Sequence, residues 1–426
     1  MSTNRINKTK EEKTSWFLFV TAWIVYAIIS MTKSAYNASM ASIIGDGLFD
    51  KTQAGTISAS FYLFYGLAQL LGVKILDKIS PMRLVLVALI GTLISIIGMA
   101  LSKSFIMMLV IWSLCGLVQF PIWPAILRII AEYLTAQQRD KAMVYIAFSY
   151  CVGMFVNYIA ASAVLRVAEW RMLFWVFAVI MVFSIALWQI VTAKTKAACD
   201  LQARKNKELL ANELNNVENK PAEKINFFKL LTVSGLIIVF LPSLARSAID
   251  MGMKTWIPTM ITESYGVSES FASMLTSILV FVNLGGVYIA NWLYPKRINN
   301  AVTAYGICFL VSLPFNILLL LTGKVPVGVI VVLLTVTTTM MYAGHQLINV
   351  IIPSYFAKYG RTGSVAALLN AVASFGIVIA NISFGYLAQH FGWGATIISW
   401  IIIVSVSLIA CAAATPIWEK FTAKKD

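Results

Sequence analysis

The stretch GVKILDKISPMR at residues 72–83 recurs in altered form as GVYIANWLYPKR at residues 286–297. Aligned without gaps, the two stretches share Gly, Val, Ile, Pro and Arg, five of twelve positions, at an offset of 214 residues. Two apolar stretches can resemble each other by chance. Each copy, however, follows the second apolar segment of its half of the chain, and this shared position favours a true internal repeat. The sequence therefore predicts two similar halves in one chain.

Composition restricts the class of protein. Of the 426 residues, 59% are hydrophobic and 12% are charged, and the mean hydropathy is +0.81. A soluble domain carries about 25% charged residues. The apolar fraction excludes a disordered chain, and five cysteines in this length exclude a disulfide scaffold. These values are typical of a helical protein that crosses a membrane many times.

Twelve apolar segments follow one another along the chain, and each is long enough for a transmembrane helix of about 20 residues. The segments are continuous and do not alternate in hydropathy, which excludes a β-barrel. We predict an all-α membrane protein in which twelve transmembrane helices form two six-helix, pseudo-symmetric bundles. The segments lie near 16–42, 54–77, 82–101, 105–133, 141–165, 170–192, 232–262, 268–292, 300–322, 327–356, 362–388 and 393–416.

The distribution of lysine and arginine predicts the orientation. The two tails, the long middle loop and four alternate short loops carry 23 of these residues, whereas the opposite loops carry five. Cytoplasmic loops are enriched in basic residues, so we expect both termini in the cytoplasm and the protein in the cell inner membrane. The same arrangement explains the net charge of +15 without nucleic acid as a partner. The first segment lacks a small-residue cleavage site, and we expect it to be retained as a helix.

The hydrophilic stretch KNKELLANELNNVENKPAEK at residues 205–224 separates the two halves. It is polar, of mixed charge and partly helical by propensity, which is typical of a solvated linker. We therefore predict an N-terminal six-helix bundle at 1–192, a cytoplasmic linker loop at 193–229 and a C-terminal six-helix bundle at 230–426. We expect the protein to be a monomer.

The loop after the second segment, KILDKISPMR at residues 74–83, resembles the cytoplasmic loop signature of the major facilitator superfamily, roughly Gly-x-x-x-Asp-Arg-x-Gly-Arg-Arg. Asp77 and the basic residue after it, Lys78, match the acidic and basic positions of the signature. Pro81 replaces the later glycine, and the first small residue is shifted to Gly72. An acid at a helix end can pair with a base across the interface of the halves, so Asp77 and Arg83 are candidate gating residues.

Three further stretches resemble the organophosphate:phosphate antiporter family of that superfamily. GLVQFPIWPAILRIIAEYLTAQQRDKA at 116–142 is similar to its fourth helix and following loop, KTWIPTMITESYGVS at 254–268 to the end of its seventh helix, and FAKYGRTGSVAALLNAVASFG at 356–376 to its tenth-to-eleventh connection. The resemblance covers nearly the whole chain and implies the major facilitator fold. It does not reach the identity of the solute. The points of likeness are Gly116, Gln119, Trp123, Pro124, Arg128, Arg139, Trp256 and Pro258.

Members of that family clasp the substrate phosphate between a basic residue in helix 1 and another in helix 7. In ISMTKSAYNASM at residues 29–40, Lys33 occupies the helix-1 position, where the family usually has arginine. In helix 7 the family position falls on Asp250, and Arg246 lies one turn away. The repeat offset instead places the equivalent of Lys33 beside Arg246, so both registers stay open and we favour Arg246. Tyr150 stands where several members have a histidine in helix 5.

Ionisable side chains at bilayer depth are costly, so they usually face a wet cavity and carry function. Lys33 either reaches the substrate or snorkels to the outer interface. Arg246 and Asp250 are spaced i, i+4, so they form either a self-neutralised pair or a switch in which a substrate anion displaces Asp250. Lys254 continues this face toward the outer mouth, where it either steers anions or snorkels. His345 is either a satisfied core residue or a functional one.

The remaining candidates are aromatic or polar. Tyr26 and Trp123 match cavity-lining positions of the family, Tyr36 is a neighbour of Lys33, and Asn283 in helix 8 is a candidate cavity or coupling group. The cysteines lack metal-ligand spacing, no glycine-rich phosphate loop occurs, and no nucleophile–base arrangement is present. We expect neither a metal, a cofactor nor enzymatic activity.

Three bases and one acid within the membrane predict a positive central cavity, which favours an anionic solute. Such a cavity is costly to reorient empty, which favours exchange of one anion for another. We predict a secondary active transporter that moves a small organic anion by alternating access, with a phosphorylated compound exchanged for inorganic phosphate as the lead case. The alternative is proton-coupled symport of a sugar acid or other carboxylate, with Asp250 or His345 carrying the proton. A further alternative is a transporter-like membrane sensor.

Overall fold

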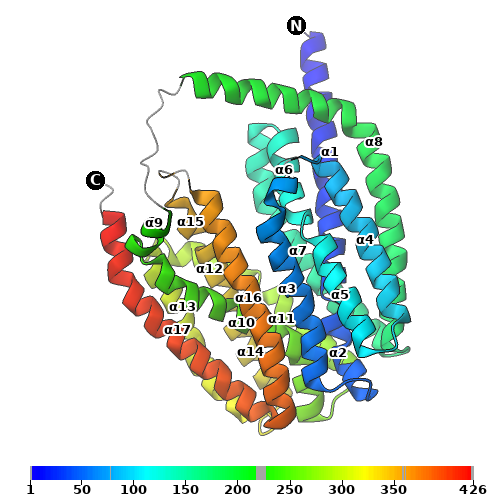
Figure 1. Ribbon diagram of the computed structural model, residues 1–426, viewed down its shortest axis with the longest axis vertical. Coiled ribbons are helices and arrows are strands. Elements are labelled where there is room, and N and C mark those ends of the chain that lie inside the picture. Colours follow the sequence, from blue (N-terminus) through cyan, green and yellow to red (C-terminus); the bar gives the residue numbers. More distant parts are fainter. Residues whose placement is uncertain (1, 77, 217–226, 357–358, 360, 424–426) are drawn as a thin grey trace.

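The computed structural model of the chain describes residues 2–76, 78–216, 227–356, 359 and 361–423. Within these ranges the chain forms helices and no strand (Figure 1). Eleven helical segments of the described ranges are long and apolar enough to cross a membrane, and α3 (Lys51–Leu76), 26 residues long, supplies the twelfth. The predicted all-α architecture with twelve membrane segments in two bundles is confirmed.

The first six membrane segments form the bundle on the right of Figure 1. Two of these segments are interrupted, the first at Ser34 and the fourth at Pro121, which has no backbone N–H for the helical ladder. Apart from α3, the helices of this half are α1 (Ser2–Lys33), α2 (Ala35–Gly45), α4 (Pro81–Leu101), α5 (Phe105–Gln119), α6 (Ile122–Tyr133), α7 (Ala136–Leu165) and α8 (Trp170–Asn216).

The last six membrane segments form the second bundle. The tenth segment is interrupted by a π-helical turn before Pro353, so the fourth segment and its counterpart in the second half are both broken. The elements of this half are α9 (Phe227–Val233), α10 (Leu236–Tyr265), α11 (Glu269–Val282), α12 (Gly285–Leu293), α13 (Ala301–Leu318), η1 (Leu319–Leu321), α14 (Val327–Gln346), η2 (Leu347–Ile351), α15 (Ile352–Ser354), α16 (Thr362–His390) and α17 (Gly392–Ala423).

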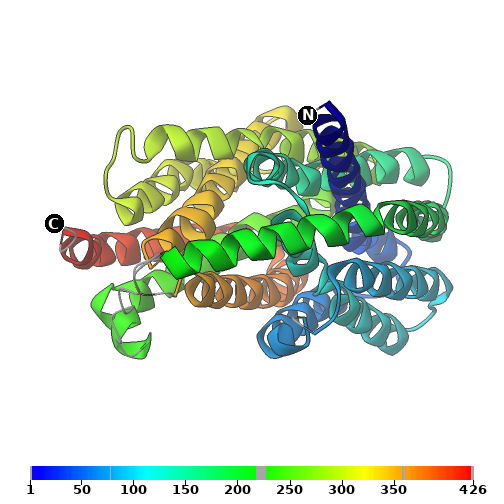
Figure 2. The ribbon, with the colours of Figure 1, turned by 90° about the horizontal axis from the view of Figure 1, so that it is seen from above.

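Both ends of the chain lie at the same end of the molecule (Figure 1), as an even number of membrane crossings requires. α8 continues beyond its membrane segment as far as Asn216 and lies across that end of the molecule (Figure 2). Asn206 anchors this extension to the end of α6, because its Nδ2 donates to the backbone oxygens of Glu132 at 2.8 Å and Leu134 at 3.0 Å. The first part of the predicted linker is therefore a docked helix.

The loop between α3 and α4 contains the stretch that resembles the loop signature described above. Asp77 lies outside the described residues. Arg83 is exposed in the first turn of α4, and its backbone N–H donates to Oγ of Ser80 at 3.4 Å, which caps the helix.

Close contacts between helices repeat in the two halves. A Cβ atom on Gly153 of α7 would lie 2.2 Å from the backbone oxygen of Ala27 in α1, and one on Gly376 of α16 would lie 2.2 Å from that of Leu244 in α10. The first pair joins the fifth and first membrane segments, and the second pair joins the eleventh and seventh. The same glycine contact thus occurs at equivalent places of both bundles, where small residues allow helices to approach closely.

We expect Gly153→Ala and Gly376→Ala each to lower the unfolding temperature of the detergent-solubilised protein, measured by intrinsic fluorescence. The added methyl group would overlap a backbone oxygen that cannot rotate away, and overpacking of this kind costs about 1–3 kcal/mol. Gly328→Ala in α14 is the control, because no heavy atom lies within 4 Å of the added Cβ and alanine suits a helix better than glycine. Unfolding temperatures equal to that of the control would contradict the two contacts.

Candidate functional site

Lys33 is the last residue of α1, directly before the interruption at Ser34. Its Nζ lies over three aromatic rings of α3, 4.2 Å from the ring centre of Tyr65, 5.3 Å from that of Tyr62 and 5.4 Å from that of Phe61. Cation–π contacts of this kind attract an ammonium group. No carboxylate of the described residues forms an ion pair with Lys33. Lys33 therefore points into the bundle and brings a positive charge that these residues do not neutralise.

A narrow cavity of about 10 Å³ adjoins Lys33, which is room for about one water molecule. Tyr26 and Tyr150 lie in its wall, and the ring of Tyr26 packs against that of Trp123 with centres 5.3 Å apart. Sequence reasoning missed Gln119 as a site residue, although it lies one helical turn before Trp123. Its buried Oε1 has no hydrogen-bond partner among the described residues. The lining residues are Tyr26, Ile29, Ser30, Lys33, Tyr65, Gln119, Ile122 and Tyr150.

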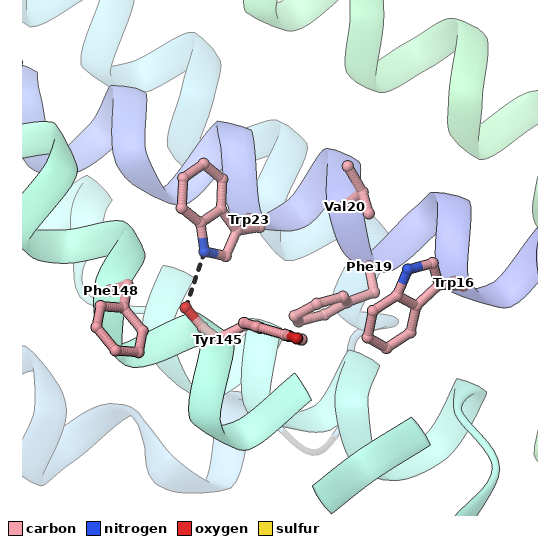
Figure 3. Close-up of a pocket in the computed structure, with 6 residues that line it drawn as sticks. All are labelled: Trp16, Phe19, Val20, Trp23, Tyr145 and Phe148. Atoms are coloured by element: carbon pink, nitrogen blue, oxygen red, sulfur yellow. Dashed lines mark hydrogen bonds between the residues drawn. The ribbon is translucent and has the colours of Figure 1, made fainter. Parts of the chain in front are cut away.

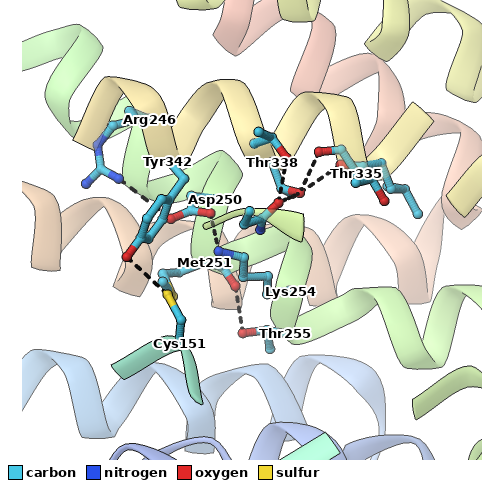
Figure 4. A network of polar contacts seen from close by, with 12 residues as sticks. Cys151, Arg246, Asp250, Met251, Lys254, Thr255, Thr335, Thr338 and Tyr342 are labelled. Atoms are coloured by element: carbon cyan, nitrogen blue, oxygen red, sulfur yellow. Dashed lines mark hydrogen bonds and ion pairs between the residues drawn. The ribbon is translucent and has the colours of Figure 1, made fainter. Parts of the chain in front are cut away.

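α10 carries three charged side chains at successive turns of one face (Figure 4). Asp250 lies between the two bases, with its Oδ2 3.7 Å from Nη1 of Arg246 and its Oδ1 2.5 Å from Nζ of Lys254. All three residues are buried, with at most 3% of their surface exposed. Lys254 therefore does not snorkel to an interface, and one carboxylate compensates two bases. Nε of Arg246 has no hydrogen-bond partner among the described residues.

Tyr342 of α14 connects this charged face to the N-terminal half (Figure 4). Nζ of Lys254 lies 5.5 Å from the centre of its ring, and its hydroxyl oxygen lies 3.1 Å from Sγ of Cys151 in α7. The ring of His345, which is also in α14, stacks on the ring of Tyr342 with the ring centres 5.9 Å apart. Nδ1 of His345 is 2.8 Å from Nδ2 of Asn349. His345 thus lies beside the charged face without an acidic partner in the described ranges.

Tyr150 belongs to both parts of the site. It lines the cavity beside Lys33, and its hydroxyl donates to Sδ of Met251, the residue after Asp250, at 3.6 Å. Because α7 and α10 belong to different halves, the candidate groups of the two halves meet at this contact. The predicted residues that belong to these two groups are Lys33, Tyr26, Trp123, Tyr150, Arg246, Asp250, Lys254 and His345.

Two predicted candidates lie elsewhere. Tyr36 is buried inside the N-terminal bundle, where its hydroxyl donates to the backbone oxygen of Ala54 at 3.1 Å. Asn283 is buried inside the C-terminal bundle, where its Oδ1 accepts hydrogen bonds from the hydroxyls of Thr338 at 3.0 Å and Thr339 at 2.9 Å. Each side chain is bonded within its own bundle and does not join the group around Tyr150.

A polar network joins the two halves one turn beyond Lys33. Nδ2 of Asn37 in α2 donates to Oγ1 of Thr255 in α10 at 3.1 Å. Oδ1 of Asn37 accepts from Ser58 in α3 at 2.8 Å, and the Ser58 hydroxyl oxygen accepts from Nδ2 of Asn381 in α16 at 3.0 Å. All four side chains are buried. They bind the halves together between Lys33 and the end of the molecule away from the termini.

Further contacts between the halves lie closer to that end. Nζ of Lys51, the first residue of α3, is 3.0 Å from Oε2 of Glu263 in α10, and Nε1 of Trp393 donates to the same carboxylate at 2.8 Å. The hydroxyl of Ser42 in α2 donates to the carboxylate of Glu269 at the start of α11. Side chains of both halves therefore hold this end of the molecule together.

Two six-helix bundles with buried charges between them define the class of membrane transporters in which a solute binds between two halves. Residues 18–381 match the family model of the Major Facilitator Superfamily, so the chain belongs to this superfamily. The membership predicted from the sequence is confirmed. A chain of this family and fold is a transporter and not an enzyme.

Similar proteins agree with this assignment. The chain is 20% identical over 415 residues to the probable hexose phosphate transport protein of Chlamydia trachomatis serovar D, covering 94% of this chain and 90% of that protein. It is 22% identical over 413 residues to the hexuronate transporter of Bacillus subtilis, covering 95% and 94%. A solved structure of a bacterial homolog to the human lysosomal transporter Spinster, inward-facing and unoccupied, matches with a TM-score of 0.77 at 15% identity, covering 96% and 98%. The first relative agrees with the resemblance to organophosphate:phosphate antiporters.

We expect Asp250→Asn to lower the unfolding temperature, because it leaves Arg246 and Lys254 buried without their carboxylate. Breaking a buried ion pair by removing one partner costs about 3–5 kcal/mol. The double variant D250N/K254M removes one charge of each sign, and we expect it to recover part of the loss. Thermal unfolding in detergent measures both effects.

Glu132→Gln is the matched control. Glu132 pairs with Arg128 at 2.7 Å in the same i, i+4 spacing, but the side chains are 35% and 26% exposed. Exposed pairs contribute at most about 1 kcal/mol, so we expect a smaller effect. An Asp250→Asn protein that unfolds no earlier than the Glu132→Gln protein would show that Asp250 does not stabilise the two bases.

Proposed function

We propose that the protein carries a small organic anion across the membrane by alternating access of the site between its halves. The lead case is a phosphorylated compound exchanged for inorganic phosphate. The observation that carries this proposal is the charge balance of the site. Among the described residues the site holds three bases, Lys33, Arg246 and Lys254, and one acid, Asp250, which pairs with Arg246 and Lys254. An excess of two positive charges matches a dianion such as a phosphate monoester.

The two halves would contribute one cation each to the anion, Lys33 from α1 and Arg246 from α10. A guanidinium group binds phosphate through two parallel N–H donors, and Nε of Arg246 has no partner among the described side chains. Asp250 lies 3.7 Å from Arg246 but 2.5 Å from Lys254. We propose that the substrate displaces Asp250 from Arg246, the longer of the two pairs, while the pair with Lys254 persists.

Exchange follows from the same charge balance. A site that carries two unmatched positive charges is costly to move through the low-dielectric interior without an anion. Return of the empty site is therefore slow, and a second anion on the opposite side speeds it. Inorganic phosphate suits this role because it presents the same group as a phosphorylated substrate.

Proton-coupled symport of a sugar acid or other carboxylate is the alternative, and the likeness to a hexuronate transporter supports it. In this mechanism Asp250 or His345 carries the proton. Protonation of Asp250 would release Arg246 and Lys254 to a carboxylate substrate. A transporter-like sensor, which binds an anion without moving it, is the further alternative.

We also propose the arrangement in the membrane. The two bundles comprise residues 1–192 and 230–426, and residues 193–229 link them on the cytoplasmic side of the inner membrane. Both termini lie on that side, which the 23 basic residues of the tails and adjoining loops support. The protein acts as a monomer in this scheme.

The test uses vesicles that contain the reconstituted protein and labelled inorganic phosphate. We expect external sugar or glycerol phosphates to drive phosphate efflux, and glucuronate or galactonate not to do so. Lys33→Ala and Arg246→Ala should each slow this efflux by about 10- to 100-fold, since a hydrogen bond to a charged group contributes about 1.5–3 kcal/mol. Lys103→Ala is the control, because Lys103 is an exposed lysine in the loop after α4.

The alternatives give different results in the same vesicles. Uptake of sugar acids that follows an imposed pH gradient and ignores internal phosphate would replace the exchange mechanism with proton symport. Saturable binding of a phosphate compound without any flux would favour the sensor. If both alanine variants support phosphate efflux at the rate of the Lys103→Ala variant, Lys33 and Arg246 do not bind the substrate.

A further inference from the structure

A groove of the N-terminal half lies between α1 and α7 (Figure 3). It encloses about 380 Å³, and all of its walls are aromatic or aliphatic. Nε1 of Trp23 donates to the backbone oxygen of Tyr145 at 2.8 Å, which ties the two helices together in the groove. The lining residues are Trp16, Phe19, Val20, Trp23, Tyr145 and Phe148.

The groove reaches the surface of the molecule, and it shares no lining residue with the cavity beside Lys33. Val20 is 39% exposed and Tyr145 is 52% exposed. The apolar part of α1 follows Lys13 in the sequence, so the groove occupies the first turns of that part, toward the end of the molecule at which both termini lie (Figure 1). Tryptophan and tyrosine are enriched at this depth, where acyl chains meet headgroups. The groove is therefore positioned to hold an acyl chain.

Two lysines lie beside the groove on the side of the termini. Lys13 precedes Trp16 by three residues, and Lys141 precedes Tyr145 by four. Residues at these spacings share a helix face, so each lysine continues a wall of the groove by about one turn. Both lysines are exposed, and neither forms an ion pair with a side chain in the described ranges. The apolar groove thus has a positively charged rim on one side.

We propose that this groove binds an anionic phospholipid, with an acyl chain between α1 and α7 and the phosphate beside Lys13 and Lys141. The sequence around the two lysines supports this occupant, because residues 1–16 and 136–145 together hold six basic and three acidic residues. Lysine side chains reach the headgroups from such positions, and anionic headgroups attract them. A ligand without an acyl chain leaves the groove empty, and a zwitterionic lipid does not match the rim.

The bound lipid would act on the two helices that carry walls of the transport cavity. Tyr26 follows Trp23 by three residues, and Tyr150 follows Tyr145 by five. An acyl chain wedged between α1 and α7 would therefore brace the pair of helices next to the cavity beside Lys33. This role is independent of the solute that the transporter carries.

The test measures lipid binding to the delipidated full-length protein in detergent by native mass spectrometry. Phosphatidylglycerol and phosphatidylcholine with identical acyl chains are titrated separately. We expect the wild type to prefer phosphatidylglycerol by about fivefold for each lysine engaged. Lys13→Gln combined with Lys141→Gln should abolish this preference and leave phosphatidylcholine binding unchanged. Val20→Trp, which fills the groove, should weaken the binding of both lipids.

Val179→Trp is the control for the added ring, because Val179 is a 56% exposed valine on α8, away from the groove. Thermal unfolding of each variant confirms that it is folded, and the double glutamine variant tests the rim without changing the groove. Phosphatidylglycerol binding by Val20→Trp at the level of Val179→Trp would overturn the groove as the site. A preference for phosphatidylglycerol that survives the loss of both lysines would overturn the assignment to an anionic lipid.

Discussion

The cost of burying charge inside a membrane is the constraint on which the centre of this protein depends. A charged side chain at this depth must be paired, bonded or wetted. Asp250 satisfies this requirement for two bases of α10 at once, whereas Nζ of Lys33 lies over aromatic rings and forms no ion pair among the described residues. The described residues therefore leave positive charge inside the molecule without a paired carboxylate. In the proposed function an anion completes this electrostatic arrangement, so binding of the solute and neutralisation of the site would be the same event.

The sequence was sufficient for the fold because a membrane requires every spanning segment to satisfy its own backbone hydrogen bonds. Few architectures are then compatible with long apolar segments and with a repeat at equivalent positions of the two halves. Lys33 could be identified from the sequence as a candidate site residue, since a lone basic residue in an apolar helix is rare. The register of helix 7 could not be identified, because the family position falls on Asp250 whereas the repeat offset places the equivalent of Lys33 beside Arg246. Both side chains are buried on one face of α10, with Nη1 of Arg246 3.7 Å from Oδ2 of Asp250.

The side-chain positions of Tyr36 and Asn283 could not be predicted from the sequence. A tyrosine or an asparagine in a membrane helix has the same sequence context whether it faces a cavity or a neighbouring helix. The rotation of the helix decides between the two, and contacts such as that of Gly153 with the backbone of α1 fix this rotation. The sequence shows the glycine, but it does not show which backbone carbonyl group the glycine contacts. Both candidates proved to be bonded within their own bundles.

The site and the contacts that join the halves share the same helices. Asn37 lies four residues after Lys33, and Thr255 directly follows Lys254, so the hydrogen bond from Asn37 to Thr255 connects the two segments that hold the site cations. The interruption at Ser34, at the junction of α1 and α2, lies between Lys33 and Asn37. An anion can shift a conformational equilibrium only through contacts that differ between the two states. In the proposed mechanism the release of Arg246 from Asp250 would be such a difference, and Asp250 lies within two turns of Thr255, whose hydrogen bond with Asn37 joins the halves.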